Sequence, residues 1–299
     1  MSENCCAGRG KNESERYDIV VVGAGSAGFS AAIAGADQGA RVALVGHGTI
    51  GGTCVNVGCV PSKALIRAAE AVRRAEDAPA RFAGIASDAI VTDWPAQKAQ
   101  VEELVSSLRK VKYSELLPEY SNVTYRVGKA SLVEGGVEVE GHHLASEKII
   151  VATGARPALP AIPGITEVIP LDSMSALALK ELPRSMIVLG GGYVGAELAQ
   201  TFARFGVDVT LVFRSRLLPE AEPEISAALA GYLADEGITV VQEVTYDSVR
   251  KTPDGGVALT VKRDGCPEVL RAERVLVATG RAPNTESLGL FEAGVELTS

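Results

Sequence analysis

The sequence has 299 residues, which is long enough for two domains of ordinary size. Its composition, 46% hydrophobic and 22% charged, is that of a globular protein, and its net charge of −8 argues against a nucleic-acid-binding surface. No apolar run approaches the roughly 20 residues that span a membrane. The N-terminal residues lack the apolar middle of a secretory signal. We therefore expect a cytoplasmic protein with no membrane segment, preceded by a disordered leader over residues 1–15.

The first predicted element is a buried strand that runs into a glycine turn. The stretch YDIVVVGAGSAG carries Gly23, Gly25 and Gly28 in the pattern G-x-G-x-x-G, and we expect a helix from Ser26 to Gln38 after it. In this context the glycines let the backbone approach a pyrophosphate, whose charge the free N–H groups of the helix start can hold. The pattern predicts a dinucleotide site, the alternative being a tight turn without a ligand.

The same pattern returns in the second half of the chain. In SMIVLGGGYVGAE, Gly190, Gly192 and Gly195 align with the three glycines of the first copy. A smaller repeat joins KIIVATGARP, with Thr153 and Gly154, to RVLVATGRAP, with Gly280. The duplication predicts an α/β fold with two Rossmann-like, three-layer, nucleotide-binding domains built on parallel sheets.

The regions between the two copies predict smaller features. Residues 94–117 are typical of a long helix, and the Pro-rich stretch 156–164 of a linker between domains. Alternating polar and apolar residues over 122–132, 136–141 and 238–277 predict antiparallel strands that extend from the parallel sheets. We place the first domain at 16–155, with a return segment at 283–299, and the second at 156–282.

The strand after each glycine turn indicates which nucleotide is bound. An acid that binds the ribose is expected about 20 residues past the turn. The first copy has Gly46 at that position, and the nearby His47 and Asp37 are poorly placed substitutes. The second copy has Phe213, followed by Arg214 and Arg216. Two guanidinium groups suit a 2′-phosphate and favour NADPH over NADH, the alternative being two arginines on a solvated loop.

Cys54 and Cys59 lie in GGTCVNVGCVPSK. In a regular helix their Cα atoms would be about 8.7 Å apart, too far for a disulfide, but Gly58 permits a distortion. Pro61 suits the first turn of the next helix, whose dipole favours a thiolate. Structural zinc lacks a second cysteine pair, the only histidines being His47, His142 and His143. We favour a redox pair over a buried, inert one.

These segments together resemble the flavin-dependent pyridine nucleotide–disulfide oxidoreductases, from about residue 17 to the end of the chain. GAGSAG, GGTCVNVGCVPSK, the two ATG segments and GGGYVGAE carry the resemblance. The valines of CVNVGCVPSK and the following IRAAEA are more similar to the mercuric reductases of that family than to its dihydrolipoamide dehydrogenases.

The resemblance implies two cofactors, FAD and NADPH, and a role for each motif. It assigns Gly23, Gly25, Gly28, Thr153 and Gly154 to FAD, places Lys63 near the flavin, and adds Gly52, Thr53 and Gly280 to the cofactor-binding residues. NADPH would bind Gly190, Gly192, Gly195, Arg214 and Arg216. Cys59 would face the flavin as the charge-transfer thiolate, and Cys54 would meet the substrate. Lys63 would approach the flavin as a buried cation paired with Glu197, the alternative being a surface lysine. Tyr193 would cover the flavin until nicotinamide enters, or would simply pack its helix.

The implied reaction is the reduction of Hg(II), delivered as a thiol complex, to Hg(0) by NADPH through Cys54 and Cys59. The family continues past FEAGVELTS with an Ala-Gly-Asp segment and a dimerisation domain, so the resemblance implies a longer, homodimeric enzyme. A dihydrolipoamide dehydrogenase or another disulfide reductase is one alternative, and a non-catalytic flavin- or metal-binding protein is another. Cys5 and Cys6 could fetch Hg(II) or be incidental. We expect Cys266, His142 and His143 at solvated turns.

Overall fold

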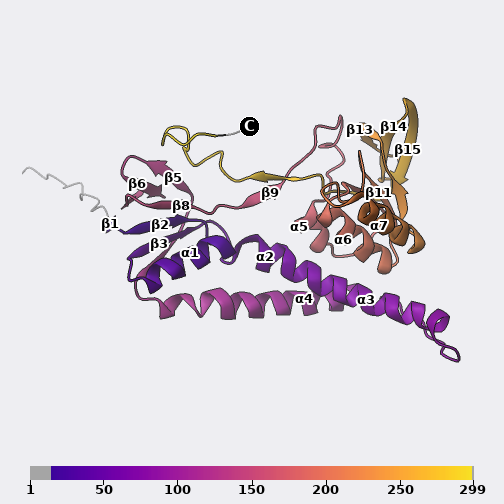
Figure 1. Ribbon diagram of the computed structural model, residues 1–299, viewed down its shortest axis with the longest axis horizontal. Coiled ribbons are helices and arrows are strands. Elements are labelled where there is room, and N and C mark those ends of the chain that lie inside the picture. The colour runs from indigo at the N-terminus through magenta and orange to yellow at the C-terminus, as the bar shows by residue number, and fades with distance from the viewer. Residues whose placement is uncertain (1–14, 298–299) are drawn as a thin grey trace, which may run out of the picture. The chain divides into compact units, whose positions relative to one another are not determined.

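The computed structural model describes residues 15–297, which form two compact units (Figure 1). The first unit contains the described residues up to Gly52, together with Arg109–Gly154 and Pro283 onward. The second unit contains Thr53–Leu108 and Ala155–Ala282. Two short strands that pair with each other, β9 (Ala155–Pro157) and β17 (Arg281–Pro283), lie where the chain passes between the units.

A parallel sheet of four strands forms the centre of the first unit. Its order is β4 (Val123–Val127), β3 (Val42–Gly46), β2 (Ile19–Val22) and β8 (Ile149–Val151). The apolar runs IVVV and VALVG are almost fully buried, as expected for strands covered on both faces. Helix α1 (Ser26–Asp37) covers one face, as Figure 1 shows, and ends one residue before the expected end.

The other face of that sheet carries a small second sheet. Strands β5 (Ala130–Val133), β6 (Gly136–Val139) and β7 (His142–Ala145) are antiparallel, and β1 (Glu15–Arg16) joins β7 in parallel. Inward-facing residues of both sheets form one core, which Leu288 and Leu290 of the return segment complete. The first unit therefore has three layers.

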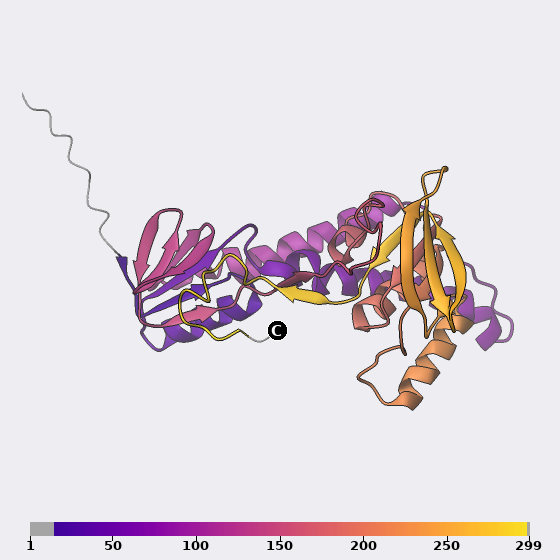
Figure 2. The same ribbon diagram turned by 90° about the horizontal axis from the view of Figure 1, so that it is seen from above.

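The second unit repeats this layering. Its parallel sheet has the order β12 (Thr239–Val241), β11 (Asp208–Val212), β10 (Ser185–Leu189) and β16 (Arg274–Val277). Helices α5 (Ser173–Leu177), α6 (Tyr193–Arg204) and α7 (Pro223–Asp235) share one core with the sheet. The antiparallel strands β13 (Thr245–Lys251), β14 (Val257–Arg263) and β15 (Cys266–Ala272) form a second core on its other face (Figure 2). The predicted α/β class with two three-layer, Rossmann-like domains is confirmed.

Three helices that follow the first glycine turn belong to the second unit, apart from their end residues Gly52 and Arg109. These are α2 (Gly52–Val57), α3 (Cys59–Arg81) and α4 (Trp94–Arg109). After α4 come a π-helical turn at Lys110–Ser114 and a 3₁₀ turn at Leu117–Glu119. Leu65 and Ala69 of α3 join the core beneath α6. The ring of Trp94 meets Phe205 edge-on at 5.4 Å between centroids. These apolar contacts explain why 53–108 groups with the second half of the chain.

Two of the predicted antiparallel stretches are partly wrong. Residues 123–127 form β4, which pairs in parallel with β3, and 239–241 and 274–277 form β12 and β16 of the second parallel sheet. β4 and β12 lie at the ends of their sheets and are less buried than the central strands, which explains their polar residues. Among residues 15–297 no helix is long and apolar enough to cross a membrane.

Candidate functional site

The first glycine turn is packed so tightly that a side chain cannot enter it. Gly23 has φ +121°, and a Cβ there would lie 2.1 Å from the carbonyl oxygen of Ala152. A Cβ on Gly28 would lie 1.7 Å from the oxygen of Gly23. Gly25 is the N-cap of α1 with no side-chain cap, so its first amides are left for a ligand. This is a cradle that fits a pyrophosphate.

The second glycine turn has the same construction. Gly190 has φ +118° and faces the oxygen of Ala278, which a Cβ would approach to 2.3 Å. A Cβ on Gly195 would lie 2.0 Å from the oxygen of Gly190. Gly192 caps α6 without a side chain, and no atom lies within 4 Å of the place where its Cβ would be. The open space over Gly192 suits a second pyrophosphate.

The two ATG segments lie behind the two turns, which explains why they repeat together. Ala152 follows β8 and backs Gly23, just as Ala278 follows β16 and backs Gly190. Asn284 is a residue that the sequence analysis missed. Its side chain donates to the carbonyl oxygen of Thr153 over 3.0 Å, and its backbone N–H donates to that of Gly154, also over 3.0 Å. The return segment thereby holds Thr153 and Gly154, the residues expected to close over a nucleotide, in place.

The strand-end positions differ between the two copies. At Gly46, a Cβ would lie 2.5 Å from the hydroxyl of Tyr125 and 2.7 Å from Cβ of Ala24. A side chain there would have to displace the ring of Tyr125 of β4, which fills the space. Burial raises the pKa of the Tyr125 phenol. In the second copy the buried ring of Phe213 takes the equivalent space, 2.8 Å from where a Cβ of Gly191 would be.

The two arginines after Phe213 have different surroundings. Nη2 of Arg216 donates to the carbonyl oxygens of Pro219 over 2.7 Å and Ala221 over 2.8 Å, so it closes its own loop. Arg214 is exposed. Beneath them, the hydroxyl of Tyr246 donates to the oxygen of Val212 over 3.1 Å, and burial raises the pKa of this phenol to about 12, opposed by the charge of Arg214. Of the two arginines, Arg214 is therefore the one whose guanidinium is not used to close its own loop.

The cysteine motif interrupts a helix at the expected residue. α2 ends at Val57, α3 begins at Cys59, and Gly58 between them is not helical, with φ −130° and ψ −115°. A Cβ on Gly58 would lie 3.3 Å from Cα of Cys54, so the chain at the break is packed closely against Cys54. Both cysteines are thiols, Cys54 half-buried and Cys59 exposed. Gly52 and Thr53, also expected among the cofactor-binding residues, form the start of α2.

Lys63 lies one helical turn after Cys59 and forms an ion pair with Glu197 of α6. Its Nζ is 2.6 Å from both carboxylate oxygens, while Thr201 donates to the backbone oxygen of Glu197 over 2.6 Å. The side chains of Lys63 and Glu197 are 55% and 41% exposed, so the pair lies at a surface of the second unit rather than buried as expected. Tyr193, the first residue of α6, is 62% exposed, which argues against simple helix packing.

Two glycine turns on parallel sheets and a cysteine pair at a helix start are the features of one known group of proteins. The family model described as pyridine nucleotide-disulphide oxidoreductase matches residues 17–299. The chain belongs to the pyridine nucleotide-disulphide oxidoreductase family. Members of this family are flavoproteins that use pyridine nucleotides, and the predicted family is confirmed.

Curated members of this family are similar to almost the whole chain. A mercuric reductase of Staphylococcus aureus is 43% identical over 95% of this chain and 52% of its own length. A mercuric reductase of Streptomyces lividans is 43% identical over 94% of this chain and 60% of its own. A dihydrolipoyl dehydrogenase of Trypanosoma brucei brucei is 36% identical, with 94% and 60% covered. The chain therefore spans about half to three-fifths of the length of these relatives.

A solved structure of the family has the same fold. The HOCl-induced flavoprotein disulfide reductase RclA of Escherichia coli superposes with a TM-score of 0.79 at 31% identity, over 95% of this chain and 61% of that one. Its Cu(II) complex matches equally well, with a TM-score of 0.79 at 30% identity.

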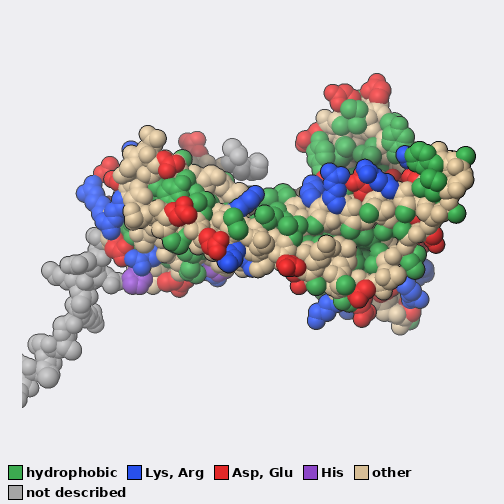
Figure 3. Space-filling model, turned by 90° about the horizontal axis from the view of Figure 1, so that it is seen from below, with side chains coloured by type: hydrophobic (Ala, Val, Ile, Leu, Met, Phe, Trp, Pro, Cys, Tyr) green, Lys and Arg blue, Asp and Glu red, His purple; other side chains and the backbone are tan. Residues whose placement is uncertain are grey.

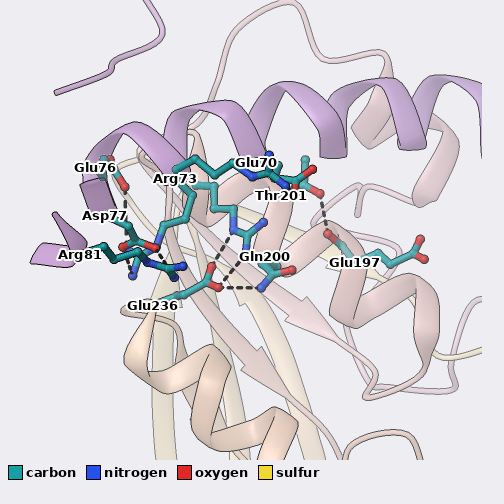
Figure 4. A network of polar contacts seen from close by, with 11 residues as sticks. Glu70, Arg73, Glu76, Asp77, Arg81, Glu197, Gln200, Thr201 and Glu236 are labelled. Carbon is teal, nitrogen blue, oxygen red and sulfur yellow. Dashed lines mark hydrogen bonds and ion pairs between the residues drawn. The ribbon is translucent and has the colours of Figure 1, made fainter. Parts of the chain in front are cut away.

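Charged residues outside the family motifs form a network that joins α3 to α6 and to the residue after α7. Figure 4 shows part of this network. It borders a cavity of about 440 Å³ that is lined by four arginines, four acids and Tyr232. Glu236 accepts two hydrogen bonds from Arg204, each of 2.7 Å, and one of 2.9 Å from Gln200. On the face shown in Figure 3, basic side chains likewise lie beside acidic ones. Because the arginines and acids that line it are equal in number, the cavity does not favour an anion. We call the Arg204–Glu236 pair, which joins α6 to the end of α7, the clamp.

The remaining candidates carry no metal site. Within residues 15–297, no three His, Cys, Asp or Glu side chains are grouped as ligands. His142 and His143 begin β7 and Cys266 begins β15, so the expectation of turns is wrong by one or two residues: the turns are at Glu140–Gly141 and Asp264–Gly265. Cys5, Cys6 and most of the expected leader lie outside the described residues.

Proposed function

We propose that this chain forms the dinucleotide-binding part of an NADPH-dependent mercuric reductase whose redox-active thiols are Cys54 and Cys59. The observation that carries the proposal is the helix break at Gly58, which lies close against Cys54 of α2 and starts α3 at the exposed Cys59. The similarity to mercuric reductases over about 95% of the chain supports Hg(II) as the substrate. Two thiolates are the ligands that such a soft ion prefers.

The first glycine turn fits FAD and the second fits NADPH, because both leave uncapped helix amides and space that only glycine allows. Bound FAD supplies the chemistry that passes a pair of electrons from the nicotinamide to a disulfide or a metal ion. Gly23, Gly25 and Gly28 would hold its pyrophosphate, and Thr153 and Gly154 would lie behind it. Gly190, Gly192 and Gly195 would hold that of NADPH.

The proposed reaction gives a role to the two cysteines and to the residues beside them. Cys54 and Cys59 would bind Hg(II) through their two Sγ atoms. Glu197 holds Nζ of Lys63 in place on the face of α3 that carries Cys59. Overall, NADPH gives two electrons to Hg(II), which leaves Hg(0), NADP⁺ and a proton. The exposed Tyr193 would contact the nicotinamide end of the second nucleotide.

The proposal includes a compartment and an assembly. Thiols that must be regenerated by NADPH belong in a reducing compartment, so we place the protein in the cytoplasm. A homodimer is the assembly that the resemblance implies for the longer enzyme.

A disulfide reductase is the second candidate. The similarity to a dihydrolipoyl dehydrogenase and to a flavoprotein disulfide reductase favours it, because the same thiol pair could exchange with a small disulfide.

The thiol roles are tested by counting thiols after reduction. The flavin-loaded protein is oxidised and titrated with NADPH without oxygen, and a thiol reagent should then find about two additional thiols per chain. Cys54→Ser and Cys59→Ser should each lose this increase. Cys266→Ser is the control, since Cys266 is exposed on β15, and it should keep the increase. Full retention in Cys54→Ser would contradict the assignment.

The substrate is tested with the same preparation. NADPH oxidation is compared with Hg(II) plus excess thiol, lipoamide and glutathione disulfide as acceptors, and the release of mercury vapour is measured. We expect Hg(II) to be the preferred acceptor. A preference for lipoamide would favour the second candidate.

A further inference from the structure

The first glycine turn lacks the carboxylate that usually binds a ribose at the end of the second strand. From the place that Tyr125 occupies, we infer that its hydroxyl takes over this role and binds the ribose of the adenosine half of the dinucleotide. The inference rests on the proposed function, in which FAD occupies this turn.

The register of the sheet brings Tyr125 to the required edge. β3 and β4 are parallel, and Leu44 pairs with Tyr125 two residues before Gly46. The ring extends forward over the end of β3, where its Oη comes within 2.5 Å of the point at which a Cβ of Gly46 would stand. Cβ of Ala24, the middle residue of the glycine turn, is 2.7 Å from the same point. The hydroxyl is therefore beside both the turn and the strand end that face a bound nucleotide.

The hydroxyl is chemically suited to a ribose. Tyr125 is half-buried, and its Oη has no hydrogen-bond partner among the residues that the structure describes. A neutral phenol can donate to one ribose hydroxyl and accept from another, whereas a carboxylate only accepts. Burial raises the pKa of Tyr125, so the phenol keeps its proton.

Space filling alone does not require a hydroxyl. In the second copy the equivalent space is filled by Phe213, an aromatic ring with no polar atom, which is 3% exposed. A ring is thus sufficient to pack this corner of the fold. The additional oxygen in the first copy lies where a ligand group is expected and contributes no hydrogen bond to the protein.

The inference is tested with Tyr125→Phe, which removes the oxygen and keeps the ring. Dissociation constants for FAD are measured on the flavin-free protein by flavin fluorescence. We expect Tyr125→Phe to weaken FAD binding about fivefold, the effect of one neutral hydrogen bond. FMN, which has no adenosine, serves as the second probe and should bind the variant and the original protein alike.

Tyr120→Phe is the matched control. Tyr120 precedes β4 and accepts a hydrogen bond through its backbone oxygen from Val123, at the end of β4 away from the glycine turn. Its FAD affinity should not change. Unfolding of flavin-free Tyr125→Phe should match that of the original protein, because the lost hydroxyl has no partner in the protein.

The outcomes separate the two proposals. Unchanged FAD affinity in Tyr125→Phe, or an equal loss for FMN and FAD, overturns the inference and leaves the proposed function standing. An original protein that does not bind FAD at all overturns the proposed function and this inference with it.

Discussion

At both glycine turns an aromatic ring occupies the corner between the turn and the next strand. The ring comes from a different residue in each copy: Phe213 belongs to the strand end itself, whereas Tyr125 reaches over from the neighbouring strand. The turn changes with it, from Ala24 in the first copy to Gly191 in the second. Each ring lies where a glycine leaves room for it, Tyr125 at Gly46 and Phe213 at Gly191. The first site therefore has a phenol hydroxyl at this corner, and the second has none.

Arg214 should determine the preference for NADPH over NADH. Arg214→Ala should weaken NADPH binding about tenfold, the effect of a lost charge-assisted contact to phosphate, and leave NADH within about twofold. Arg214 is exposed, whereas Arg216 is engaged with the oxygens of Pro219 and Ala221. Affinities for both nucleotides are measured by fluorescence quenching of Trp94, the only tryptophan of the chain.

Arg216→Ala is the matched comparison. It should loosen the loop that Arg216 closes and weaken NADPH and NADH by similar factors. An Arg214→Ala protein that loses both nucleotides equally would contradict the phosphate role.

At the scale of elements, sequence patterns predict what is local. The strand, the glycine turn and the helix from Ser26 follow from apolar runs and from glycine, and the helix break between Val57 and Cys59 follows from Gly58. The placement of α3 and α4 on the second unit does not, because it depends on contacts such as Trp94 with Phe205 between distant parts of the chain. Tyr125 was missed for the same reason: nothing near Gly46 in the sequence indicates which residue fills its space.

The clamp between α6 and α7 gives a prediction at this scale. Arg204 and Glu236 are only 17% and 14% exposed and share two hydrogen bonds. Glu236→Gln removes the carboxylate that is hydrogen-bonded to this mostly buried guanidinium, so the free energy of unfolding of the second unit should fall by about 2 kcal/mol. Urea unfolding followed by Trp94 fluorescence measures this, because Trp94 lies in the core of that unit.

Arg184→Gln is the control in the same unit. Its ion pair with Glu273 has an arginine that is 93% exposed, so the free energy of unfolding should change by less than about 0.5 kcal/mol. Equal effects of the two substitutions would mean that the clamp contributes no more than a surface pair.

At the scale of the whole molecule, the chain consists of two units that each have their own sheet, glycine turn and core. A ligand stabilises the unit that binds it by mass action, by about 2.7 kcal/mol at a concentration 100 times its dissociation constant. In calorimetry, FAD should therefore raise the melting temperature of the first unit, and NADP⁺ that of the second, by a few degrees. Trp94 fluorescence identifies the transition of the second unit.

Single methyl groups should remove these shifts one at a time. A Cβ on Gly28 would lie 1.7 Å from the oxygen of Gly23, and one on Gly195 would lie 2.0 Å from that of Gly190, so either alanine forces its turn open. Gly28→Ala should abolish the FAD shift and keep the NADP⁺ shift, and Gly195→Ala should do the reverse. Gly231→Ala in α7 meets no atom within 4 Å and should keep both shifts, with a gain of up to about 1 kcal/mol in helix stability. If Gly28→Ala removed both shifts, the two turns would not be separate sites, and the duplication would not mean one nucleotide per unit.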